Sequence, residues 1–194
     1  DITRLDKEAA ALAAELATLT ARIIPARREA AAAIAANLEN ELRQLGFSEQ
    51  VRVIPDFAVQ EIWPGVQDER GRILWAPNPG QPPQPLDKIA SGGELSRIML
   101  AIKNVLADND VIDTLIFDEV DTGISGSAAQ KVGLKLREVS RNRQVICVTH
   151  LAQIAALAES HLFISKHVQK GRTFTEITLL DFEGRKQELA RIMG

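Results

Sequence analysis

Cysteine and long apolar runs are scarce in this sequence, and each scarcity excludes a class of protein. Cys147 is the only cysteine, which excludes an internal disulfide and a cysteine-cluster metal site. Because residues 145–148 are apolar, we expect Cys147 to be a buried strand residue rather than a reactive thiol. No apolar run approaches the ~20 residues that span a bilayer, and the start does not resemble a signal peptide. These features fit a cytoplasmic protein with no membrane partner.

A large net charge is absent too. Lys and Arg number 23 against 26 Asp and Glu, so the formal net charge of -3 gives no electrostatic case for nucleic-acid binding. A DNA-binding surface would therefore be local or lie elsewhere. Hydrophobic residues make up 45% of the chain, which is typical of a protein with a packed core. Since the chain begins at Asp1 within a regular pattern, we expect it to be part of a longer polypeptide.

Residues 1–46 have the composition and periodicity of a long helix. Pro25 lacks a backbone donor and should kink or interrupt this helix, and Gly46 is a plausible stop. We expect one strand of a coiled-coil arm whose partner lies upstream or on another chain; the alternative is a single amphipathic helix packed on the domain. The expectation depends on apolar residues that alternate at spacings of 3 and 4, the a/d seam of a heptad repeat: Ile2, Leu5, Ala9, Leu12, Leu16, Leu19 and Ile23.

Residues 47–194 have the pattern of an α/β lobe. Two apolar strands separated by a helix predict a βαβ unit in a buried parallel sheet. Further strands and a last helix follow, so the fold class is α/β, with a mostly parallel sheet and flanking helices behind a helical arm. The expected elements are strands near 51–54, 57–59 and 72–75, a proline-rich loop over 75–86, helices at 92–107, 127–141 and 151–159, and strands at 114–117, 144–148, 162–164 and 173–180.

The first candidate site is the helix start at residues 91–96. Ser91 followed by Glu94 just before an apolar-periodic run forms a capping box, which alone explains the pattern structurally. Gly92 and Gly93 add a backbone that a ligand could approach closely, at the positive end of a helix. Phosphate binding and simple capping therefore remain equal alternatives on these residues alone.

The second candidate is the pair of carboxylates after the apolar strand 114–117. Asp118 and Glu119 follow the C-terminal end of that strand, the edge at which open parallel sheets bind ligands. Asp118 is suited to hold Mg²⁺, which prefers oxygen ligands, and Glu119 to polarise a water that attacks a phosphoryl group. The alternative is a pair of acids in an ordinary turn.

The third candidate is His150, which ends the next strand. Its strand should lie beside or close to the strand that leads to Asp118 and Glu119. A histidine at that edge could contact a terminal phosphate or orient the attacking water. A lone histidine is more often a structural hydrogen-bonding residue, which is the alternative here.

The order of these three elements resembles the C-terminal half of ABC-type ATPases: signature motif, Walker B and histidine switch. The resemblance implies ATP as substrate and Mg²⁺ as cofactor, with Asp118 supporting the metal. It implies Glu119 as the catalytic base and His150 as the sensor of the γ-phosphate. It also implies a homodimer of ATP-bound heads, in which the signature residues meet ATP held by the opposing head: Ser91, Gly92, Gly93 and Glu94.

Within that family, the runs at 90–100, 118–126 and 148–155 resemble SMC-like members that act in bacterial double-strand break and recombinational repair. This likeness implies DNA as a partner and a nucleoid-associated location. The chain departs from most ABC ATPases at Ser125, where the D-loop usually has an aspartate, so the role of that aspartate is in doubt here.

The phosphate-binding loop Gly-x-x-x-x-Gly-Lys-Ser/Thr is missing from the chain. Without it the β- and γ-phosphates lack both a backbone cradle and a lysine. In SMC-like proteins that loop belongs to the N-terminal half, beyond the coiled coil. We therefore expect the N-terminal half of the same protein as a partner, and no ATP hydrolysis by this chain alone.

Three other functions compete with this interpretation. An SMC-type ATPase of chromosome organisation would share most motifs, although the run at 118–126 argues against it. The motor subunit of a membrane transporter would keep both ATPase halves close in sequence, without a heptad arm. A non-hydrolysing coiled-coil interaction module would not need Asp118, Glu119 and His150.

Overall fold

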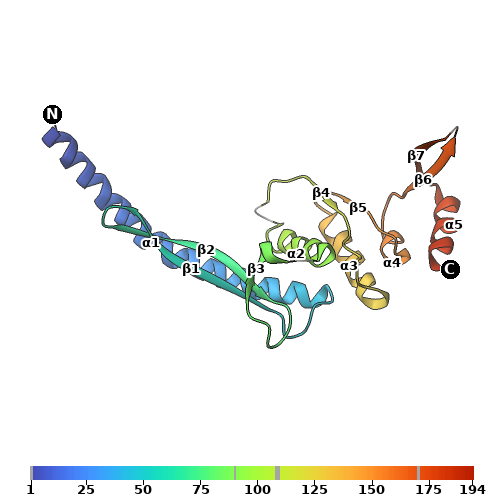
Figure 1. The fold of residues 1–194 in the computed structure, drawn as a ribbon, viewed down its shortest axis with the longest axis horizontal. Helices are drawn as coiled ribbons and strands as arrows, with labels where there is room; N and C mark the ends of the chain where they lie inside the picture. The colour runs from blue at the N-terminus through green and yellow to red at the C-terminus, as the bar shows by residue number, and fades with distance from the viewer. Residues whose placement is uncertain (1, 90, 108–109, 170) are drawn as a thin grey trace. The chain divides into compact units, whose positions relative to one another are not determined.

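The computed structural model describes residues 2–89, 91–107, 110–169 and 171–194 of the chain (Figure 1). Ala90, the first residue of the motif at 90–100, lies outside the described residues. Contacts between residues divide the chain into two compact units. Unit 1 comprises Asp1–Arg43 and Phe47–Ile89, and unit 2 comprises Gln44–Gly46 and Ala90–Gly194. The division into an arm at 1–46 and a lobe at 47–194 stays a prediction.

Helix α1 runs without interruption over Ile2–Gln44, with Pro25 inside it. The predicted interruption at Pro25 is therefore wrong. A proline inside a helix costs about 3 kcal/mol, and the alanine-rich sequence on both sides has high helix propensity to offset it. Gly46 follows the helix with a φ of 87°, as the predicted stop requires.

The two ends of α1 differ in the burial of their apolar side chains. Near the C-terminal end, Leu38 and Leu42 are buried. Toward the N-terminus most of the predicted heptad residues are exposed, with Leu5 at 56% and Leu12 at 60%, whereas Leu16 is half-buried. By length and composition alone, α1 is also the one helix among the described residues that could cross a membrane.

A long antiparallel hairpin completes unit 1. Strand β1 (Arg52–Trp63) pairs with β2 (Val66–Ala76), so the three predicted short strands are parts of one hairpin. The short strand β3 (Gln84–Pro85) pairs with β2, and the 3-10 turn η1 (Leu86–Lys88) follows. Figure 1 shows the hairpin running along α1, and the ion pairs Arg27–Asp68 (2.9 Å) and Arg28–Glu69 (2.5 Å) join the two. Buried Trp75 anchors the hairpin's base.

Unit 2 contains the predicted βαβ unit. Helix α2 (Gly92–Val105) is followed by β4 (Thr114–Phe117), α3 (Gly126–Val139) and β5 (Gln144–Cys147). The strands β4 and β5 are parallel neighbours, with Phe117 paired to Cys147 at their C-terminal ends. Helix α4 covers only Ala152–Ala155, shorter than predicted. The parallel pairing brings the ends of both strands to one edge, which positions the candidate site.

The sheet β4–β5 is buried on one face only. Leu115 and Phe117 are buried, whereas Ile116 is 70% exposed and Ile146 is 42% exposed. Among the described residues, the predicted burial of this parallel sheet is therefore seen on one face only. The near-continuous apolar sequence of β4 and β5 does not show which part of a protein covers each face of the sheet.

An antiparallel hairpin and a helix end the chain. Strand β6 (Leu162–Gln169) pairs with β7 (Arg172–Leu179), and α5 (Phe182–Met193) follows. The Asp181 side chain caps α5 by accepting a hydrogen bond from the Gly184 amide at 2.8 Å. Most apolar side chains of the hairpin are exposed, including Val168 and Leu179.

Candidate functional site

The start of α2 is built as the sequence predicts. Ser91 is the N-cap residue, and its Oγ accepts a hydrogen bond from the Glu94 amide at 3.4 Å. This contact satisfies one of the amides that a helix start leaves unpaired. Gly92 is exposed and Gly93 is buried. The capping interpretation is confirmed, and phosphate binding at this helix start stays a prediction.

Asp118 and Glu119 lie directly after β4, and both are exposed. The Glu119 amide donates a hydrogen bond to Asp118 Oδ1 at 2.9 Å, which fixes the Asp118 carboxylate. Glu119 has a φ of 58°, the left-handed region that residues other than glycine seldom adopt. Such conformations cost on the order of 1–3 kcal/mol and cluster at functional sites. The strain is therefore consistent with a functional role for Glu119.

The helix start of α2 packs directly against the segment after β4. A Cβ added at Gly92 would overlap with Glu119 Oε2, and one added at Gly93 would lie 2.8 Å from both Thr122 Cβ and Thr122 O. The Ser96 hydroxyl donates to Asp118 O at 2.5 Å. Close approach to the backbone of the turn thus requires a glycine at Gly93, whereas a Cβ at Gly92 would meet only the end of the Glu119 side chain.

His150 follows β5 at the same edge of the sheet, as predicted. The Val148 amide donates to Phe117 O at 2.9 Å, which carries the strand pairing to the edge. The imidazole of His150 is exposed, and its Nδ1 lies 3.1 Å from Oδ2 of Asp121. The structure therefore brings the three predicted elements together around one segment, residues 118–122.

Arg97 holds this segment from inside the protein. Its Nη1 donates to Thr122 O at 2.8 Å and to Val120 O at 3.3 Å. Burial lowers the pKa of the Arg97 guanidinium, while the charges of Glu94 and Asp121 act in the opposite direction. A buried arginine on α2 thus fixes the backbone on both sides of Asp121.

The donor set at this edge fits a magnesium ion only with help from a ligand. Among the described residues, His, Cys, Asp and Glu side chains form no group of three or more that could hold a metal. Mg²⁺ is commonly bound by one or two carboxylates together with phosphates and waters, and the exposed Asp118 carboxylate suits that role. Cys147 is half-buried in β5 rather than buried as predicted. Burial, together with the charges of Asp121 and Asp118, raises the pKa of Cys147 to about 12, which disfavours the reactive thiolate.

Sequence reasoning missed Asp121 and Arg97. Asp121 lies in the run 118–126 and Arg97 in the run 90–100, but neither has a predicted role of its own. Charged residues are rarely buried without a partner, but no local pattern marks these two, since each has a polar neighbour in sequence, Ser96 or Thr122. Ser125, which stands where most ABC ATPases have the D-loop aspartate, is the N-cap residue of α3.

Curated proteins similar to this chain include DNA repair proteins named RecN. The DNA repair protein RecN of Xylella fastidiosa (strain Temecula1 / ATCC 700964) is 45% identical over 169 residues, which are 87% of this chain and 30% of that protein. RecN of Streptomyces coelicolor is 40% identical over an alignment of 196 positions, which covers 95% of this chain and 34% of that protein. The chain belongs to the RecN family of DNA repair proteins. It spans about a third of the length of these two RecN relatives. No family model matches the chain.

Solved structures similar to this RecN-family chain are SMC head domains. The Smc head domain with a coiled coil and joint derived from Pyrococcus yayanosii has a TM-score of 0.59 and 21% identity, covering 83% of this chain and 29% of that one. A structure concerned with ATP-driven dimerization and DNA-stimulated activation of SMC ATPases has a TM-score of 0.53 and 19% identity, covering 88% and 97%. The RecN-family chain therefore has the α/β fold of SMC ATPase heads.

Proposed function

We propose that this chain is the C-terminal part of an SMC-like ATPase that acts in DNA double-strand break and recombinational repair. The observation that carries the proposal is the meeting of the α2 start, Asp118–Glu119 and His150 at one edge of the parallel pair β4–β5. Membership of the RecN family supports the repair role. ATP binding closes two heads into a homodimer, and hydrolysis releases them.

Each candidate residue has a role that its surroundings support. Asp118 holds Mg²⁺, which would neutralise charge on the phosphates. Glu119 activates the attacking water as catalytic base, and its carboxylate is exposed for that purpose. His150 contacts the γ-phosphate. The signature residues bind ATP of the opposing head through the helix start: Ser91, Gly92, Gly93 and Glu94.

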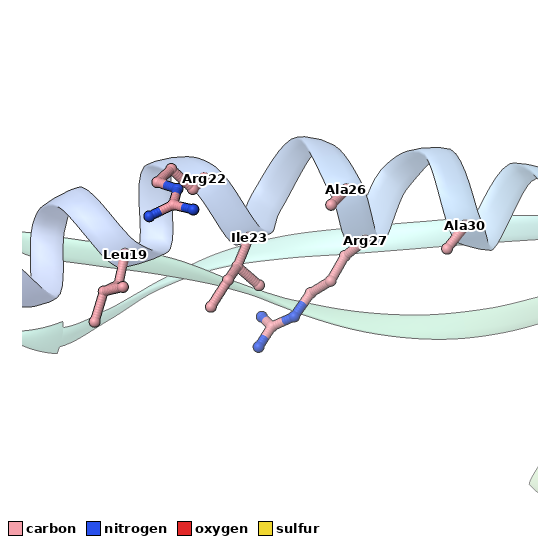
Figure 2. A pocket seen from close by; sticks show the side chains of 6 residues that line it. All are labelled: Leu19, Arg22, Ile23, Ala26, Arg27 and Ala30. Carbon is pink, nitrogen blue, oxygen red and sulfur yellow. The ribbon is translucent and has the colours of Figure 1, made fainter. Parts of the chain in front are cut away.

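Two uncovered apolar surfaces support the N-terminal half of the same protein as a partner. The exposed face of β4–β5, with Ile116 and Ile146, suits a neighbouring lobe that carries the phosphate-binding loop. On α1, an open groove is lined by six residues, and Figure 2 shows Leu19, Ile23 and Arg27 extending from one side of the helix. Its lining is Leu19, Arg22, Ile23, Ala26, Arg27 and Ala30. This groove suits the other strand of the coiled coil.

The same features bear on location. Arg27 and Arg28 form ion pairs with the β1–β2 hairpin and place charged side chains in the middle of α1. Charged side chains at that position are unfavourable for a helix in lipid. We interpret α1 as a coiled-coil helix of a cytoplasmic, nucleoid-associated protein without a membrane partner. DNA is bound by the complete assembly.

Replacing Glu119 tests the proposal. In the complete protein, Glu119→Gln should lower kcat for ATP hydrolysis by at least about 100-fold, because the base is lost. ATP binding should persist, and the ATP-bound dimer should accumulate. The control is Glu183→Gln on α5, an exposed carboxylate remote in sequence from the motifs, which should leave kcat unchanged. Turnover retained in Glu119→Gln would refute the assignment of the base.

An SMC-type ATPase of chromosome organisation is the second candidate, favoured by the likeness to SMC heads. The 45% identity to RecN over most of the chain outweighs that likeness, since the SMC structures are about 20% identical. A non-hydrolysing interaction module is the third candidate. Glu119→Gln separates it from the ATPase, because the module would show no turnover to lose.

A further inference from the structure

Asp121 is the most deeply buried acid near the candidate site, and the proposed roles in ATP hydrolysis do not involve it. Asp121 is only 3% exposed. Burying a carboxylate costs several kcal/mol unless it is well partnered. The partners of Asp121 therefore indicate why the carboxylate is there.

Three groups after β5 converge on one oxygen of Asp121. The Thr149 hydroxyl donates to Oδ2 at 2.5 Å, and the His150 amide donates to the same Oδ2 at 2.9 Å. The His150 Nδ1 lies 3.1 Å from that oxygen. Thr149 Oγ1 in turn accepts from the Leu151 amide at 3.1 Å, so the whole turn after β5 is fixed. One carboxylate thus holds both the backbone and the ring of His150.

The orientation of the imidazole follows from this contact. A carboxylate beside Nδ1 favours a proton on Nδ1, which leaves Nε2 directed away from Asp121. The ring is exposed, so no surrounding packing fixes it. Arg97 fixes Asp121 in turn, through the carbonyls of Val120 and Thr122.

We propose that Asp121 is the positioning residue of His150, setting the ring orientation and the nitrogen that carries the proton. This inference rests on the proposed function for its effect on ATP hydrolysis. Because Asp121 is buried, we assign it no direct contact with the nucleotide. It acts through His150 and connects the histidine to α2, the helix that begins with the signature residues.

A double-mutant cycle in the complete protein tests the inference. Asp121→Asn keeps the shape and an acceptor oxygen but removes the charge, so kcat should fall about 10- to 100-fold while KM for ATP changes little. In a His150→Ala background, Asp121→Asn should lower kcat by less than about 2-fold, because the group through which it acts is gone. Equal effects of Asp121→Asn in both backgrounds would overturn the proposal.

A matched control removes a similar contact at the other end of the same strands. The Thr114 hydroxyl donates to Gln144 Oε1 at 3.2 Å, and Thr114→Val removes this bond between β4 and β5. This variant should leave kcat unchanged. A loss equal to that of Asp121→Asn would mean that any weakening of the strand pair lowers activity, and would overturn the proposal.

A spectroscopic readout separates this inference from the proposed function. With ¹⁵N-labelled histidine, the ring nitrogens of His150 are assigned by their absence in His150→Ala. The wild type should show the proton on Nδ1, and Asp121→Asn should shift it toward Nε2. An unchanged pattern would overturn the inference even if ATP is hydrolysed. The expected pattern would support it even if the complete protein lacks ATPase activity, which would refute only the proposed function.

Discussion

At the scale of single residues, the two glycines at the start of α2 have different neighbours. A side chain at Gly92 would meet the carboxylate of Glu119, the movable end of a long side chain. A side chain at Gly93 would meet Thr122 Cβ and its backbone oxygen, neither of which can move independently of the turn. Adjacent and chemically identical positions should therefore respond differently to the same change.

Replacing each glycine by alanine tests this difference. Gly93→Ala should lower the free energy of unfolding by about 1–3 kcal/mol, because the turn at Thr122 must shift. Gly92→Ala should fold with nearly unchanged stability but displace Glu119, lowering kcat of the complete protein about 10- to 100-fold. Thermal unfolding and ATPase kinetics measure the two effects. Equal destabilisation by both variants would contradict the packing described here.

The sequence predicted which candidate residues lie together, because their meeting depends on their order along the chain. Asp118, Glu119 and His150 follow apolar strands, and a parallel sheet necessarily brings the ends of neighbouring strands to one edge. Asp121 and Arg97 could not be predicted in the same way. Their burial depends on how α2 packs on the turn after β4, which no local pattern encodes.

At the scale of elements, Glu39 joins α1 to the β1–β2 hairpin. Its Oε1 accepts hydrogen bonds from the Val53 amide at 2.9 Å and from Arg52 at 3.2 Å, and Arg43 pairs with its Oε2 at 2.9 Å. Burial raises the pKa of Glu39, but these hydrogen bonds outweigh burial and leave the pKa below its ordinary value of 4.5. The helix and hairpin are therefore linked through an ionised carboxylate.

This linkage predicts how acid affects unit 1. A carboxylate with a lowered pKa in the folded state stabilises above its unfolded pKa and loses that contribution as pH falls through the folded value. Stability should therefore fall below about pH 4.5. Glu39→Gln should lower the free energy of unfolding at neutral pH by about 1–2 kcal/mol and reduce the further loss in acid. Unfolding followed by circular dichroism across pH measures both.

Glu29 provides the control for that experiment. It is exposed on the same helix, and Glu29→Gln should change stability by less than about 0.5 kcal/mol. If wild type and Glu39→Gln lose the same stability on acidification, Glu39 does not provide the acid-sensitive link.

Pro25 gives a second prediction for α1. Since the helix continues through it, Pro25→Ala should restore a backbone hydrogen bond and raise the stability of the helix by about 1–3 kcal/mol. The expected result is a higher Tm in far-ultraviolet circular dichroism. An unchanged or lower Tm would mean that the proline fits its place in the helix without cost.

The elements that the sequence predicted best are those set by local pattern, namely α2, β4, α3 and β5. The sequence predicted separate short strands in place of the long hairpin, because Pro55 and Gly71 interrupt the apolar pattern. Both residues lie within the paired strands β1 and β2. The prediction gave Pro25 more weight than the alanine-rich sequence around it, and therefore did not include one continuous helix α1. Tertiary pairing decides such cases.

At the scale of the whole molecule, the uncovered apolar surfaces fit the proposal that this chain is part of a larger assembly. One face of β4–β5 is exposed, and most of the N-terminal heptad residues of α1 are exposed as well. The chain also lacks the phosphate-binding loop that ATP hydrolysis requires. Both observations are accounted for if another part of the same protein completes the sheet, the coiled coil and the active site.

The most direct test of this account is ATP hydrolysis by the chain alone and after mixing with the N-terminal part of the same protein. The account predicts no hydrolysis by the chain alone and hydrolysis by the mixture, which Glu119→Gln in this chain abolishes. Hydrolysis by the chain alone would contradict it, as would a folded, nucleotide-bound mixture that does not turn over ATP.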